Sequence, residues 1–266
     1  MNDRIRDVRE RLIASGTVVA PDGTAHELFP VAIGPVEGRA IRDRIIEEGA
    51  MHTFETGLGY AMSTLWICEG LVSNGPGVSH VAMDPFQLES APAAGTSYAG
   101  VGLRTLDQAG VRSFVEFHEQ ESQIVLPRLL EEGRMFDLAF VDGNHRFEAV
   151  FLDLVYAGRL LREGGVVVVD DMQLPAIRRA VEFCIDNLGW TIEGSGSVGS
   201  DHAWSVLRTG APLGSSARSL SSPTSGSGER AYRIGFRAIS QRGRFRPHNS
   251  WIVNLTSENS MTKPAV

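Results

Sequence analysis

Two short apolar runs that end in aspartate constrain this sequence more than any other feature. Residues 136–141 (FDLAFV) stop at Asp142, and residues 166–169 (VVVV) stop at Asp170 and Asp171. Both runs are rich in β-branched or aromatic side chains and show no polar alternation, as expected for parallel strands that are buried on both faces. We therefore predict two neighbouring parallel strands with acidic residues at their carboxyl ends.

The segment between the two runs predicts a helix. Apolar side chains recur at helical spacing from residue 147 to residue 161, and Gly164-Gly165 is the predicted stop. A strand-helix-strand crossover brings the carboxyl ends of neighbouring strands to one edge of the sheet, where ligands of open α/β folds bind. The three aspartates and His145 are therefore expected to line one crevice.

Charge suggests what this crevice binds. Three close carboxylates repel one another unless a proton, a basic side chain or a divalent cation neutralises them. The chain has one lysine, Lys263, and no arginine adjoins Asp170 or Asp171. The economical interpretation is an all-oxygen site for Mg²⁺ or another divalent cation, formed by Asp142, Asp170 and Asp171. The alternative is that one aspartate caps a helix while the others accept hydrogen bonds from loop amides.

Length and charge narrow the class of protein. The 266 residues, 42% of them apolar, can bury the core of one large α/β domain. The net charge of -7 argues against a nucleic-acid partner. No secretory signal and no run of membrane-spanning length is evident, which predicts a cytoplasmic protein without a membrane partner. Cys68 and Cys184 lie on predicted helices and are expected to be core thiols and not a disulfide framework.

Four segments are predicted along the chain. They are an N-terminal helical cap on the acceptor side (1–50), the core (51–209), a flexible linker (210–228) and a basic, poorly ordered tail (229–266). The linker is rich in Gly, Ser, Ala and Pro and cannot bury enough surface to become ordered unaided. The tail carries aromatic residues among arginines but lacks sustained periodicity, which favours disorder over a docking segment.

A glycine turn follows the first predicted strand of the core, residues 51–55. The turn, Thr56-Gly57-Leu58-Gly59, leads into a helix, so a ligand can approach both the backbone and the helix N-terminus. The next strand, residues 78–83, ends at Asp84, where a carboxylate can bind a ribose diol. Together these features indicate an adenosine-containing cofactor, and the competing interpretation is a tight turn with a capping carboxylate.

Two cofactor classes share this arrangement. A nicotinamide dinucleotide needs a small residue at the third position of the glycine motif, because a helix packs close beneath its pyrophosphate. Met62 occupies that position here. S-adenosyl-L-methionine (SAM) has no pyrophosphate, and it needs a donor such as Ser63 for its carboxylate and an acid such as Glu55 near its amino group. The sequence therefore favours SAM.

These motifs resemble those of the class I SAM-dependent methyltransferases. The resemblance rests on ETG with Ser63, on DPFQ, on SQ followed by LPRL, on DGNH, and on GG leading to DD. It is closest to the metal-dependent, catechol O-methyltransferase-like branch and to bacterial natural-product O-methyltransferases, and it covers roughly residues 35–207. It implies a doubly wound, mostly parallel seven-stranded sheet that ends in a hairpin of residues 190–193 and 203–207.

The resemblance also implies a role for each matching residue. Six positions correspond to cofactor contacts: Glu55, Gly57 and Ser63 at the methionine end, Asp84 at the ribose, Ser122 at the adenine, and Asp142. Asp142, Asp170 and Asp171 correspond to the metal ligands. His145 stands where the animal catechol enzymes carry a lysine base. Ala61 stands where a glycine is common in the cofactor loop, so the details of that loop differ.

The predicted function is therefore SAM-dependent, metal-assisted methylation of a hydroxyl on a small molecule, a sugar or a phenol of secondary metabolism. A metal ion lowers the pKa of an alcohol, and His145 can accept its proton near neutrality. The alternative role for His145 is a structural histidine bonded to a loop carbonyl. Alternative functions are an N-methyltransferase, a nicotinamide oxidoreductase, or a non-catalytic SAM-binding interaction protein. The sequence is also compatible with a homo-oligomer.

Overall fold

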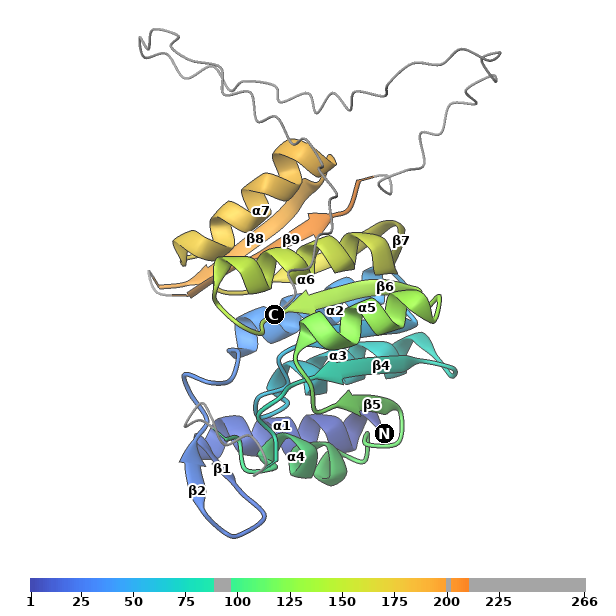
Figure 1. Ribbon diagram of the computed structural model, residues 1–266. Coiled ribbons are helices and arrows are strands. Elements are labelled where there is room, and N and C mark those ends of the chain that lie inside the picture. The colour runs from blue at the N-terminus through green and yellow to red at the C-terminus, as the bar shows by residue number, and fades with distance from the viewer. Residues whose placement is uncertain (89–96, 200–201, 211–266) are drawn as a thin grey trace, which may run out of the picture. The chain divides into compact units, whose positions relative to one another are not determined.

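A seven-stranded sheet in the order β5-β4-β3-β6-β7-β9-β8 is the centre of the structure (Figure 1). The computed structural model describes residues 1–88, 97–199 and 202–210. The strands are β3 (His52–Thr56), β4 (Ser79–Met83), β5 (Val115–His118), β6 (Phe136–Val141), β7 (Leu161–Val169), β8 (Thr191–Val198) and β9 (His202–Arg208). The first five strands in the order are parallel, and β9 is antiparallel to both of its neighbours. The predicted doubly wound sheet and its final hairpin are confirmed.

Helices cover both faces of this sheet (Figure 1). One layer contains α1 (Asn2–Ser15), α2 (Pro35–Glu47), α3 (Met62–Asn74) and α4 (Val101–Ala109), and the other contains α5 (Ser122–Glu131), α6 (Phe147–Leu160) and α7 (Pro175–Leu188). Side chains alternate along β7, with Val166 and Val168 in one core and Val167 and Val169 in the other. Both faces are therefore buried, which explains why the apolar runs lack polar alternation.

The N-terminal helices pack directly on α3. Arg9 of α1 is buried, pairs with Glu69 of α3, and lies 3.4 Å from the centroid of the Trp66 ring. Helix α2 approaches α3 at Gly38, where an added Cβ would lie 2.1 Å from Nε1 of Trp66. A glycine at this position therefore sets how closely α2 packs, and hence where the neighbouring side chain of Glu37 lies.

One predicted boundary is wrong. Helix α6 ends at Leu160 and β7 begins at the next residue, so Gly164-Gly165 lies inside the strand and is not the helix stop. The β6–β7 register shifts between Phe136 and Leu138, opposite this glycine pair. Gly164 has a φ of 66°, which lets the extra residues bulge out of the ladder. The apolar periodicity hid the boundary because the same residues suit a buried helix and a buried strand.

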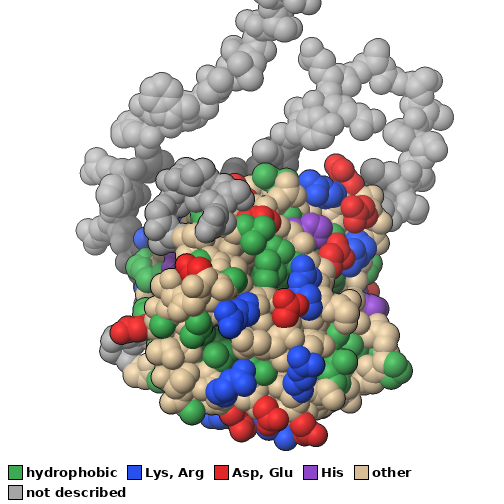
Figure 2. Space-filling view, turned by 90° about the horizontal axis from the view of Figure 1, so that it is seen from below, with side chains coloured by type: hydrophobic (Ala, Val, Ile, Leu, Met, Phe, Trp, Pro, Cys, Tyr) green, Lys and Arg blue, Asp and Glu red, His purple; other side chains and the backbone are tan. Residues whose placement is uncertain are grey.

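A two-stranded hairpin, β1 (Thr17–Val19) and β2 (Ala25–Glu27), lies between α1 and α2 in the chain. Seen from below the view of Figure 1, basic and acidic side chains are interspersed over the surface (Figure 2). Within the described ranges, no helix combines the length and apolar character that a bilayer span requires. The predicted linker and tail lie outside the described residues, apart from Gly210.

Candidate functional site

A cavity of about 1180 Å³ opens at the carboxyl ends of the parallel strands. Its walls come from the loops after β3, β4, β6 and β7 and from the first turn of α5. The N-terminal segment contributes residues 29–34, and the final hairpin contributes Val198 and His202. One cavity thus contains the predicted glycine turn together with Asp142, Asp170 and Asp171, which we call the acidic edge, as expected for an open α/β fold.

The glycine turn follows β3 and contacts the ends of the two neighbouring strands, β4 and β6. Gly57 has a φ of 89°, and an added Cβ would lie 2.1 Å from the backbone oxygen of Asp142. The Gly57 N–H donates to the carbonyl of Met83 at 2.9 Å. The turn is therefore held against the ends of β4 and β6, and a residue with a side chain does not fit there. Gly57 itself faces the cavity.

Glu55 and Ser63 lie beneath this turn at different depths. Glu55 is fully buried, and its carboxylate accepts hydrogen bonds from Oγ of Ser63 at 2.7 Å and from Thr64. Nε2 of His80 lies 3.2 Å from the same carboxylate. Ser63 lines the cavity, with its proton directed at Glu55, so its hydroxyl offers an acceptor lone pair to the cavity. Direct contact of Glu55 with a cofactor stays a prediction, because the carboxylate is engaged behind Ser63.

Asp84 lines the cavity, and its carboxylate is bonded to the glycine turn. One oxygen accepts the N–H groups of Leu58 at 3.1 Å and Gly59 at 2.8 Å, together with the amide of Gln87 at 3.1 Å. The other accepts the N–H of Phe86 at 2.8 Å. Burial raises the pKa of Asp84, and these hydrogen bonds oppose the rise. Asp84 fixes the turn, as the competing interpretation expected, and its ribose contact stays a prediction.

Ser122 begins α5 and faces the cavity. Behind it lies Asp153 of α6, a buried carboxyl group that the sequence analysis overlooked. Burial raises the pKa of Asp153 to about 6, and the hydroxyls of Ser122 and Thr56 oppose the rise. The sequence could have indicated Asp153, because it lies three positions after Val150 and therefore on the buried face of α6.

The ends of β6 and β7 bring the predicted metal ligands together. Val141 pairs with Val169, so Asp142 and Asp170 follow at adjacent positions on the two strands. Asp142 and Asp171 are partly exposed, whereas Asp170 is buried. Burial and the charges of nearby carboxylates raise the pKa of Asp142 and the pKa of Asp170 above their ordinary values. Donor atoms of Asp142 and Asp171 lie within 4.8 Å of one another together with His145, whereas Asp170 is grouped with Glu37 and His202. A hard divalent cation between Asp142 and Asp171 would relieve the repulsion of their charges.

His145 faces the same aspartates. Its Nε2 lies 2.8 Å from Oδ2 of Asp171 and 3.9 Å from Oδ1 of Asp142, and about half of its side chain is exposed. The two carboxylates, Asp142 and then Asp171, raise the pKa of His145. Burial acts to raise the pKa of Asp171, but the contact with His145 outweighs burial, and the pKa of Asp171 is lowered. The partners of His145 are therefore carboxylates, whereas the alternative interpretation expected a loop carbonyl.

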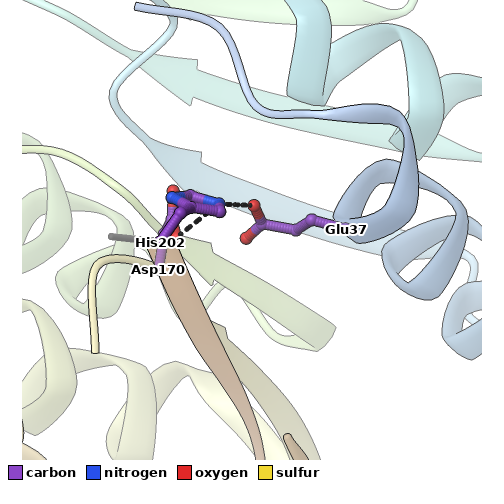
Figure 3. Close-up of side chains that lie close together, drawn as sticks. All are labelled: Glu37, Asp170 and His202. Atoms are coloured by element: carbon purple, nitrogen blue, oxygen red, sulfur yellow. Dashed lines mark hydrogen bonds and ion pairs between the residues drawn. The ribbon is translucent and has the colours of Figure 1, made fainter. Parts of the chain in front are cut away.

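A second cluster adjoins the acidic edge and was not predicted (Figure 3). Nε2 of His202 on β9 lies 2.6 Å from Oε2 of Glu37 on α2 and 3.4 Å from Oδ1 of Asp170. Glu37 is fully buried, and its Oε1 has no hydrogen-bond partner in the described part of the chain. The available signal was the helical spacing of Glu37 with Ile41 and Ile45, which places a charge on a buried stripe.

Comparisons of the sequence identify related proteins. Residues 54–172 match a family model described as a methyltransferase domain. The chain is 27% identical over 143 residues to a catechol O-methyltransferase of Niastella koreensis, a match that covers 53% of this chain and 58% of that protein. It is 30% identical over 161 residues to a Mycolicibacterium smegmatis protein assigned as an O-methyltransferase, covering 60% of this chain and 70% of that protein. The match thus spans less than two thirds of the Niastella protein.

Solved structures share the fold. An O-methyltransferase from Bacillus cereus in complex with SAH has a TM-score of 0.58 and 18% identity, covering 78% of this chain and 91% of that one. The O-methyltransferase TomG from Streptomyces achromogenes in complex with SAM has a TM-score of 0.59 and 21% identity, covering 78% and 90%. At these identities the likeness establishes the arrangement of helices and strands.

Proposed function

We propose a methyl-transfer function on the premise that this chain belongs to the class I SAM-dependent O-methyltransferases, in their catechol O-methyltransferase-like branch. The proposed reaction moves the methyl group of SAM to a hydroxyl of a small molecule, a sugar or a phenol, with a divalent cation such as Mg²⁺ at the acidic edge. The observation that carries this proposal is the meeting of the glycine turn and the acidic edge in one cavity. Two reactants anchored in one cavity can be held in line for transfer.

The proposed cofactor contacts are of two kinds. Gly57, Ser63 and Ser122 line the cavity and can touch a ligand directly. Glu55 and Asp84 support them, because Glu55 orients the Ser63 hydroxyl and Asp84 fixes the N–H groups of the turn. The carboxylate of Asp84 also reaches the cavity wall, where a ribose hydroxyl would add to its present hydrogen bonds.

The proposed metal ligands are Asp142, Asp170 and Asp171, which follow β6 and β7; donor atoms of Asp142 and Asp171 lie within 4.8 Å of each other, and Asp170 precedes Asp171 in the chain. When bound, the metal lowers the pKa of the acceptor hydroxyl, while SAM supplies an electrophilic methyl group. His145 is proposed to accept the hydroxyl proton at Nε2. Its present contacts with Asp142 and Asp171 favour the protonated imidazole, so this role requires that the charge of the aspartates be neutralised.

Calorimetry with SAH and transfer assays with simple phenols and sugars test the proposal. We expect SAH to bind, and methyl transfer to hydroxyls to stop with a chelator and to resume with added Mg²⁺. Transfer that resists the chelator would remove the metal from the proposal. Transfer to amines but not to hydroxyls would favour an N-methyltransferase, and SAH binding without transfer to any acceptor would favour a non-catalytic SAM-binding protein.

A further inference from the structure

We propose that Glu37, Asp170 and His202 form a second cation site, suited to a transition metal such as Co²⁺, Mn²⁺ or Zn²⁺. Each residue offers one donor atom, and these atoms lie within 4.8 Å of one another (Figure 3). The site goes beyond the proposed function, because binding of Mg²⁺ at the acidic edge requires neither Glu37 nor His202. Asp170 has two carboxylate oxygens and adjoins both sites.

The charge of the cluster favours a bound cation. Glu37 is 0% exposed and Asp170 is 4% exposed, so water screens neither carboxylate well. In the described part of the chain, His202 is the one basic side chain that forms an ion pair with either of them. A single imidazolium can balance only one of these two carboxylates when both are ionised. A divalent ion bound by all three side chains would balance both carboxylates.

An unsatisfied oxygen points to the same conclusion. Oε2 of Glu37 is bonded to His202 at 2.6 Å, but Oε1 is buried without a hydrogen-bond partner among the described residues. Figure 3 shows the Glu37 carboxylate extending from α2 toward Asp170 and His202. Buried carboxylate oxygens are normally paired or bound to a metal. The free lone pairs of Oε1 are therefore available to a cation.

The donor set of this site includes an imidazole nitrogen, as does the group of Asp142, His145 and Asp171, but the two carboxylates of this site are more deeply buried. Imidazole nitrogen suits transition metals, whereas Mg²⁺ prefers oxygen ligands and waters. His202 lines the main cavity and its side chain is 28% exposed, so an ion can enter from that side. The ligands come from elements that are already fixed, since α2 packs on Trp66 at Gly38 and β9 is paired with β7. The site should therefore retain a transition metal in the presence of excess Mg²⁺.

Titration with Co²⁺ in excess Mg²⁺ tests the proposal, because the visible absorption of Co²⁺ reports ligation by the protein. The full chain is titrated without SAM or acceptor, alongside the variants Glu37→Gln and His202→Asn. The control is His145→Gln, which removes an imidazole that pairs with Asp171 at 2.8 Å outside this cluster. We expect the unaltered chain and the control to bind Co²⁺ equally. The two cluster variants should bind it about tenfold or more weakly.

Two results would overturn the proposal. The first is that Mg²⁺ abolishes Co²⁺ binding to the unaltered chain. The second is that His145→Gln loses the Co²⁺ absorption while His202→Asn keeps it, which would place the ion beside Asp142 and Asp171. Thermal unfolding verifies that each variant folds, and if the buried Glu37→Gln does not, His202→Asn at the partly exposed position decides. The readout involves no methyl transfer, so it is independent of the proposed function.

Discussion

At the scale of single residues, the close approach of backbones shapes the site as much as side-chain chemistry does. Gly57 combines a φ of 89° with a contact in which an added Cβ would lie 2.1 Å from the Asp142 carbonyl oxygen. We expect Gly57→Ala to lower the free energy of unfolding by roughly 2–4 kcal/mol. SAH affinity should fall as well, because the turn would move. Urea denaturation and calorimetry measure the two effects.

Gly133→Ala is the matched control for this substitution. Gly133 has a φ of 70°, but an added Cβ there would meet nothing within 4 Å. Its replacement should therefore cost only the backbone strain, roughly 1–2 kcal/mol, and leave SAH affinity unchanged. Equal losses of stability in the two variants would show that the contact with Asp142 does not restrict residue 57.

His145→Gln tests the proposed base. The substitution removes the proton acceptor but keeps a polar side chain of similar reach. Turnover should fall by roughly 10²- to 10⁴-fold, with little change in SAH affinity. The control is His118→Gln, because His118 also pairs with a carboxylate, Glu116 at 2.8 Å, but lies outside the cavity. Unchanged turnover in His145→Gln would remove this residue from the mechanism.

At the scale of helices and strands, the position of α2 depends on one glycine. An added Cβ on Gly38 would lie 2.1 Å from Nε1 of Trp66, in a buried contact. We expect Gly38→Ala to reduce the free energy of unfolding by roughly 1–3 kcal/mol, because α2 must move away from α3. Urea denaturation measures this change. Co²⁺ binding should weaken too, since Glu37 moves with the helix.

The control on the same helix is Gly34→Ala. Gly34 is the N-cap of α2 and has a φ of -78°, and an added Cβ there would contact nothing within 4 Å. The substitution should cost less than about 1 kcal/mol, since glycine is only a moderate N-cap residue. If Gly38→Ala is no more destabilising than Gly34→Ala, close packing on Trp66 does not determine where α2 lies.

The crossover of β6, α6 and β7 could be predicted because its strands are buried on both faces and therefore read as apolar runs. The end of α6 could not, because leucines suit the helix and the strand equally well and the glycine pair serves a bulge. Glu37 and His202 are 165 positions apart and meet only through tertiary packing. Asp84 follows its predicted strand, but its hydrogen bonds to the turn depend on how that turn folds.

At the scale of the whole molecule, a charged network links the N-terminal segment to the final strands. The carboxylate of Glu48, which follows α2, accepts hydrogen bonds from Arg208 of β9 at 2.6 and 2.9 Å and from Arg162 of β7 at 3.1 Å. Arg208 also bonds Glu193 of β8 at 2.7 and 2.8 Å. The pKa of Glu48 is lowered by the hydrogen bond of Arg208, with a contribution from Arg162, while burial opposes this change.

This network predicts a loss of stability in acid. Because the pKa of Glu48 is lower in the folded chain than in the unfolded one, its contribution is fully present above the unfolded pKa of about 4.3. It is lost as the pH falls through the folded pKa. Glu48→Gln should lower the free energy of unfolding by roughly 1–3 kcal/mol at pH 7 and flatten its dependence on acid. Urea denaturation across this pH range measures both.

Glu47→Gln is the control. Glu47 precedes Glu48 in the chain, its side chain is 65% exposed, and its carboxylate lies 3.7 Å from Arg44. An exposed pair of this kind contributes roughly 0–1 kcal/mol, so the variant should keep the stability and the acid dependence of the unaltered chain. A Glu48→Gln variant with an unchanged pH profile would show that the network does not couple folding to proton uptake.

The four valines that precede Asp170 cannot specify their own alignment. A slip of one residue would move β7 by roughly 3.3 Å and exchange its valines between the two cores, yet three of the four positions would still hold a valine. Such a slip would remove little apolar contact, but it would displace Asp170 and Asp171. The bulge at Gly164-Gly165 opposes a slip of β7, because the extra residues leave the ladder at these glycines. An irregularity at one end of the strand thereby holds the chemistry at the other end in place.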